Sequence, residues 1–146
     1  MRIVHSSADI SRDVESGSPL EVNVLFTSTG ATMAATKVAG KLADNLGARI
    51  RIIVPQVVPF PLPLAEPAIK PEFTANRIQA MLSQYSVDAD VQVCLCREKL
   101  NGSIAVLKPH SLILIGGRRR IWRTEEYRLA RVLRRRGHEG VLVEQE

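Results

Sequence analysis

Two short turns contain the residues of this chain that are best suited to bind a phosphate or a nucleotide. The first is Thr-Ser-Thr-Gly at residues 27–30, and the second is Gly-Gly-Arg-Arg at residues 116–119. Hydroxyl groups, bare glycine backbone and guanidinium groups all bind phosphate oxygens, and backbone N–H groups at a helix N-terminus attract anions. With one apolar contact added, the predicted ligand-binding residues are Thr27, Ser28, Thr29, Gly30, Val54, Gly116, Gly117, Arg118 and Arg119.

The same turns offer no obvious catalytic group. Neither contains Asp, Glu or His, so no general base is at hand, and we expect a protein that is not an enzyme. Such turns would suit a phosphate or a nucleotide, of which ATP and AMP are candidates, with at most slow hydrolysis. The alternative is purely structural, because Ser, Thr and Gly also cap helices and allow tight strand-to-helix turns. Both interpretations remain open at this point.

An arginine-rich segment is the strongest compositional signal. Residues 118–136 contain nine arginines and two glutamates, a local net charge of +7, whereas the whole chain carries +5. Such a surface would suit an acidic protein or a nucleic acid, although the chain is only 4% aromatic and has no platform for stacking bases. The alternative is a solvated helix face, which we favour. The candidate contacts for an anionic partner are Arg128, Arg131, Arg134, Arg135 and Arg136.

The sulfur and imidazole groups do not form a recognisable metal site. Cys94 and Cys96 alternate within an apolar segment, where residues two apart lie too far from each other for an unstrained disulfide. The three histidines are scattered along the chain. We therefore expect no metal and two buried thiols, consistent with a reducing compartment.

Alternating strands and helices must position the two turns. Apolar segments predict five strands at residues 22–26, 48–58, 89–96, 111–115 and 140–143, and helical periodicity predicts helices at 31–46, 72–85, 98–108 and 122–136. Strands separated by helices need crossovers, and right-handed crossovers give a parallel sheet. We predict one doubly wound, Rossmann-like α/β domain with strand order 3-2-1-4-5. Both turns would then meet at the carboxyl end of the sheet, between its first and fourth strands.

The remaining segments complete the predicted organisation. Residues 1–20 are Ser-rich and predict a flexible N-terminal tail, in which only Ile3 and Val4 could form a short strand; the domain spans residues 21–146. Six of the eight prolines fall between residues 55 and 71 and predict a stiff, extended loop. No signal peptide is visible, and no apolar run approaches the ~20 residues that a membrane helix needs. We expect a cytoplasmic protein without a membrane segment.

The layout over residues 21–144 resembles the universal stress protein family. The likeness is closest at residues 109–118, Pro-His-Ser-Leu-Ile-Leu-Ile-Gly-Gly-Arg, because the family has a similar apolar fourth strand that ends in Gly-Ser-Arg. The resemblance implies a five-stranded parallel sheet, usually a dimer, and a family divided into ATP binders and non-binders. The dimer edge would be the last strand, at Val141, Leu142 and Val143.

The glycine motif of the ATP-binding members is incomplete in this chain. Gly116 matches its first glycine, but Arg119 stands where the second is expected, and Thr29 takes the place of the family's acidic residue after the first strand. A side chain at position 119 would crowd a loop that needs bare backbone near phosphate. We therefore predict a non-catalytic binding or regulatory domain that forms a homodimer and does not bind ATP in the family's manner.

Overall fold

The computed structural model describes residues 2–6, 20–117 and 125–144. Strands and helices alternate from the second strand onward, as the sequence predicts. The elements are β1 (Arg2–Ser6), β2 (Glu21–Leu25), α1 (Thr29–Leu46), β3 (Arg49–Val57), α2 (Pro71–Gln84), β4 (Asp90–Cys96), α3 (Lys99–Ala105), β5 (Leu112–Gly117), α4 (Glu125–Arg135) and β6 (Glu139–Glu144).

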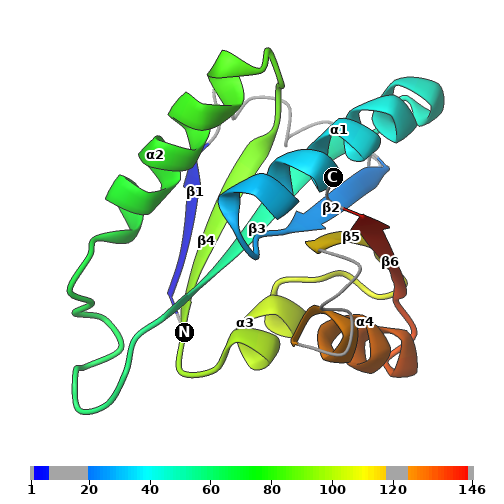
Figure 1. Ribbon diagram of the computed structural model, residues 1–146. Helices are drawn as coiled ribbons and strands as arrows, with labels where there is room; N and C mark the ends of the chain where they lie inside the picture. Colours follow the sequence, from blue (N-terminus) through cyan, green and yellow to red (C-terminus); the bar gives the residue numbers. More distant parts are fainter. Residues whose placement is uncertain (1, 7–19, 118–124, 145–146) are drawn as a thin grey trace.

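One sheet of six strands organises the chain, in the order β1-β4-β3-β2-β5-β6 (Figure 1). The strands β2 to β6 run parallel to one another, and counted from β2 their order is 3-2-1-4-5. The predicted doubly wound α/β fold is therefore confirmed. The sixth strand, β1, lies within the segment predicted as a tail and runs antiparallel to β4, with Ile3 opposite Cys94.

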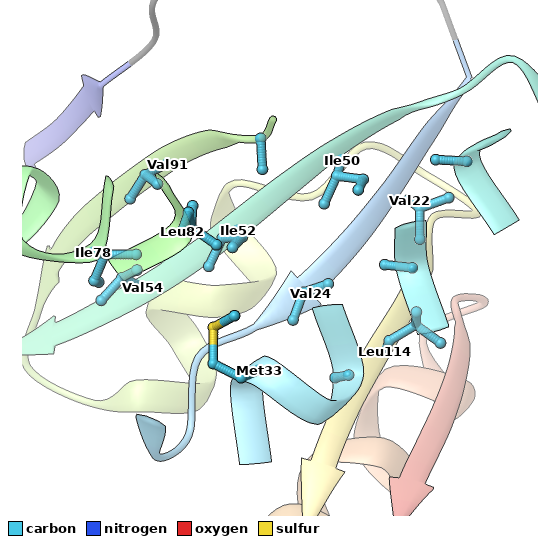
Figure 2. Packing of buried hydrophobic residues seen from close by; sticks show 14 of the residues in the cluster. Val22, Val24, Met33, Ile50, Ile52, Val54, Ile78, Leu82, Val91 and Leu114 are labelled. Carbon is cyan, nitrogen blue, oxygen red and sulfur yellow. The ribbon is translucent and has the colours of Figure 1, made fainter. Parts of the chain in front are cut away.

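Helices cover both faces of the sheet: α1 and α2 lie on one face, and α3 and α4 on the other (Figure 1). Alternate residues of the buried strands supply the two cores, so that Ile52 and Val54 of β3 pack under α1 and α2, whereas Ile53 packs toward α3 and α4. Figure 2 shows the first core, in which strand side chains meet Met33 of α1 and Ile78 and Leu82 of α2. This apolar burial on both faces is typical of a parallel sheet.

The α3 helix is shorter than its predicted range of 98–108, and its glycine explains how it packs. A Cβ atom on Gly102 would lie 2.6 Å from Sγ of Cys96 and 3.5 Å from Sγ of Cys94. The glycine therefore allows the helix to approach β4 directly over the two thiols. Its low helix propensity is offset by this close contact.

A buried polar network crosses the sheet beneath α3. Arg51 donates from Nε to Oδ1 of Asn23 (2.9 Å), from Nη1 to Oε1 of Gln92 (3.0 Å), and from Nη2 to the carbonyl of Val106 (3.1 Å). Asn23 in turn donates to the carbonyl of Leu112 (3.0 Å). The network thus joins four strands to the C-terminal end of α3, and each buried polar side chain gains a partner.

The proline-rich segment is only partly a loop. Pro55 lies within β3 and Pro71 begins α2, so the loop spans residues 58–70, shorter than the prolines suggested. The sheet tolerates Pro55 because of where β2 ends. Ile53 directs its carbonyl toward β2 and accepts from the N–H of Phe26, which lies just beyond the last residue of β2. Pro55 faces the same way two residues later, so its missing N–H would lie past the end of β2.

Within the described residues, the structure contains no helix that is both long enough and apolar enough to cross a membrane.

Candidate functional site

The two predicted turns meet at the carboxyl end of the sheet. Strands β2 and β5 are neighbours, with Leu25 opposite Ile115, so the segments that follow them emerge side by side. The hydroxyl of Thr27 donates to the carbonyl oxygen of Gly116 across 3.2 Å. This bond joins the first turn directly to the second, at the point where the strand order reverses.

The first turn is built around the N-terminus of α1. Ser28 is the N-cap residue, and its Oγ accepts from the N–H of Ala31 (3.3 Å), while the N–H of Thr27 donates to Oγ1 of Thr32 (3.1 Å). The capping role predicted as an alternative is therefore present. The side chains at Ser28 and Thr29 and the backbone at Gly30 are nevertheless exposed, so this turn presents polar groups to solvent at the positive end of the helix dipole.

The second turn is packed tightly against α1. A Cβ atom on Gly116 would lie 1.9 Å from the carbonyl oxygen of Ala31, so only a glycine permits this approach. Gly117 is buried and ends β5. Of the remaining predicted contacts, Val54 is 4% exposed and belongs to the core under α1 and α2, and Arg118 and Arg119 lie outside the described residues.

The arginines of α4 form an exposed face opposite a buried one. Leu129, Ala130 and Leu133 are buried in the core shared with α3. The five candidate contacts for an anionic partner are exposed, namely Arg128, Arg131, Arg134, Arg135 and Arg136. One of them also has a structural role, because Nε of Arg134 donates to the carbonyl of Gly140 (2.9 Å) and ties the helix to β6.

The predicted dimer edge, β6, ends the sheet on its β5 side. Val143 packs against the core under α1, and Leu142 packs against the core under α4. Gly140 lies close to α4, since a Cβ there would be 3.2 Å from the carbonyl oxygen of Ala130. Val141 is 36% exposed. Helices thus partly cover both faces of β6, while among the described residues only β5 pairs with its backbone.

The cysteines are buried free thiols, as predicted. Burial, and to a lesser extent the neighbouring Cys96, raises the pKa of Cys94 to about 11. Burial, and to a lesser extent the negative charge of Glu98, also raises the pKa of Cys96. Both groups are therefore held as thiols and are poorly suited to nucleophilic chemistry. Within the ranges that the structure describes, no group of three or more His, Cys, Asp or Glu side chains could hold a metal ion.

One arginine that sequence analysis did not single out organises the loop after β3. Arg97, directly after β4, donates from Nη1 to the carbonyls of Val58 (3.0 Å) and Leu62 (2.7 Å), and its guanidinium lies 4.1 Å from the ring centroid of Phe60. The ring is 80% exposed. A cation immediately after an apolar strand is a signal that could have drawn attention to Arg97, but its partners lie 35 or more positions away in the chain.

The geometry thus places the turn at residues 27–30 against Gly116, and leaves Val54 apart from them in the core. The exposed arginines occupy a different element, α4, and the β6 edge lies beside it. No family model matches this chain, and no curated protein matches it either.

Proposed function

We propose that the chain is a non-catalytic binding domain, a divergent relative of the universal stress proteins, which works in the cytoplasm as a homodimer joined through β6. The observation that carries this proposal is the partner-free outer edge of β6 among the described residues. The strand order 3-2-1-4-5 and the apolar strand β5 ending in two glycines also support the relationship.

The composition of β6 suits strand addition. It contains three consecutive apolar residues, Val141 to Val143, between glutamates at both ends, and no proline. An uncovered edge of this kind presents backbone N–H and C=O groups that a second strand can satisfy. Helices partly cover both faces of β6, and among the described residues no strand pairs with its outer edge, so this edge is the side on which we expect pairing.

Backbone direction and apolar content favour one register for an antiparallel pair of β6 strands. Glu139 donates its N–H to the carbonyl of Ser111 beside β5, so the alternate residues Gly140, Leu142 and Glu144 direct their backbone groups to the outer edge. A two-fold axis through Val141 would place Leu142 opposite Gly140 and Val143 opposite Glu139. An axis through Leu142 instead places Leu142 opposite its own copy and Val141 opposite Val143, with Glu144 opposite Gly140. We therefore expect the second register, in which the apolar residues pair with one another.

The molar mass in solution tests this proposal. Light scattering should give twice the 16.1 kDa of the single chain. Val141→Lys should shift the protein to monomer while it remains folded, since a lysine on an edge strand opposes pairing. The matched control is Val57→Lys, at a similarly exposed valine near the end of β3, which should stay dimeric. A monomeric wild-type protein, or a dimer unaffected by Val141→Lys, would refute the proposal.

A second candidate function is phosphate binding at the N-terminus of α1, favoured by the exposure of Ser28, Thr29 and Gly30 beside Gly116. AMP should then raise the melting temperature, because a ligand that binds only the folded state stabilises it. Gly30→Glu should abolish this rise without unfolding the protein, since a carboxylate suits the first turn of a helix but repels phosphate. Gly30→Ala serves as the neutral control and should retain most of the rise.

A further inference from the structure

A cavity of about 490 Å³ lies at the carboxyl end of the sheet, on the face covered by α3 and α4, apart from the two turns described above. Its described lining residues come from the end of β3, the segment after β4, the start of α3 and the first half of α4. The lining residues are Val57, Arg97, Glu98, Lys99, Leu100, Arg128 and Leu129. Its volume falls within the range typical of small-molecule sites.

The floor of this cavity is aliphatic. Leu129 is 5% exposed and belongs to the core between the sheet and α4, and Leu100 packs against the same core. Val57, the last residue of β3, is 44% exposed. An apolar group bound here would cover Val57 and remove apolar surface from water, which favours binding.

Positive charge exceeds negative charge among the described residues that line the cavity. The described lining includes three cationic side chains, Arg97, Lys99 and Arg128, and one carboxylate, Glu98. That carboxylate already accepts a hydrogen bond from Nδ2 of Asn101 (3.0 Å). Arg97 is held in place by its bonds to the proline-rich loop, so its charge is fixed before any ligand arrives. Such a preorganised cation costs little ordering entropy on binding.

We propose that this cavity binds a small amphipathic anion, with a hydrocarbon chain on Val57, Leu100 and Leu129 and a carboxylate held by Arg128 and Arg97. A guanidinium recognises a carboxylate through strong charge-assisted hydrogen bonds. A nucleotide fits less well, because among the described residues no Asn, Gln, Ser or Thr side chain lines the cavity to satisfy the polar edge of a base. This inference is independent of dimerisation through β6.

Calorimetric titration with octanoate tests the proposal on the full chain. Wild-type protein should bind it with a Kd below about 1 mM, and octan-1-ol, which lacks the charge, should bind more weakly. Val57→Trp should weaken octanoate binding at least about tenfold by filling the cavity, and Leu100→Phe provides a second filling variant. Arg128→Gln should weaken binding about tenfold through loss of the charged hydrogen bond.

The control is Arg77→Gln, at an exposed arginine on α2 that does not line the cavity, which should bind octanoate like the wild type. Circular dichroism establishes that each variant is folded. The proposal is overturned if octanoate does not bind, or if binding is unchanged in both Val57→Trp and Arg128→Gln. Binding of AMP that is lost in these variants, without octanoate binding, would show that the ligand class is wrong.

Discussion

The backbone of Gly116 lies directly against the carbonyl of Ala31, so that a Cβ atom at position 116 would be only 1.9 Å from that oxygen. Gly116→Ala should therefore push α1 away from β5 and lower the free energy of unfolding by about 3 kcal/mol, at the upper end of overpacking effects. Urea denaturation measures the loss. The control is Gly40→Ala in α1, where a Cβ would meet nothing within 4 Å. That change should stabilise by about 0.5–1 kcal/mol through helix propensity, and equal effects of the two substitutions would contradict the contact.

Removal of Arg51 should strongly destabilise the fold. Arg51→Met leaves the buried side chains of Asn23 and Gln92 without their guanidinium partner, and stability should fall by about 2–4 kcal/mol. The same substitution at the exposed Arg77 of α2 should change stability by less than about 0.5 kcal/mol. If chemical denaturation gave similar losses for both variants, the network would not stabilise the sheet as described.

Protonation of His138 should weaken the folded state in mild acid. Its Nδ1 accepts from the N–H of Ser111 (3.1 Å), which requires an unprotonated nitrogen. Burial, and then the neighbouring His110, lower the pKa of His138 from its usual 6.5. The unfolded chain therefore binds this proton more readily. The contribution of His138 to stability is complete above pH 6.5, and it is lost as the pH falls from 6.5 toward the lower folded-state value.

A variant separates this effect from other titrations. His138→Asn keeps an acceptor near Ser111 but does not titrate, so the melting temperature should depend less on pH between about 7.5 and 5 than in the wild type. His110→Asn should reduce the pH dependence by a smaller amount, because His110 is the lesser cause of the lowered pKa. Identical pH profiles for wild type and His138→Asn would contradict this role.

The two native thiols should react slowly with a disulfide reagent. Cys94 and Cys96 are buried, and their pKa values are raised, so little thiolate is present and the reagent must wait for the structure to open. Ellman's reagent at pH 8 should label both rapidly only after denaturation. Val141→Cys adds a partly exposed thiol as a positive control, which should react in the native protein. Native labelling of the wild type as fast as that of this variant would be inconsistent with the structure.

The fold was predictable because strand and helix periodicities are local properties of the sequence. The apolar run before Gly116 and the alternation around Ile52 each mark a buried strand, and the crossover rule then orders them. The strand at Arg2–Ser6 was only a possibility, since a segment of five residues forms a strand through its pairing with β4, which the local sequence does not reveal. The prolines at 55 and 71 suggested too long a loop. Whether Pro55 can lie in a strand depends on whether its missing N–H would have faced a neighbouring strand, and the local sequence does not show where that strand ends.

The candidate site was only partly predictable for a similar reason. Fold topology brought Thr27 and Gly116 together as expected, since parallel strands share their carboxyl ends. The partners of Arg51 and Arg97 could not be foreseen, because they depend on strand register and on a loop 35 or more residues away from Arg97. Val54, predicted as a ligand contact, is instead buried under α1 and α2, because it lies on the same face of β3 as Ile50 and Ile52.

Oxidative cross-linking of Leu142→Cys tests the proposed β6 dimer most directly. In the expected register this residue lies opposite its own copy, at a separation that a disulfide can span, whereas Val141 lies opposite Val143. Leu142→Cys should form a covalent dimer on non-reducing gels, and Val141→Cys should yield little or none. No cross-link in Leu142→Cys, or equal cross-linking of both variants, would contradict the proposed pairing of two β6 strands.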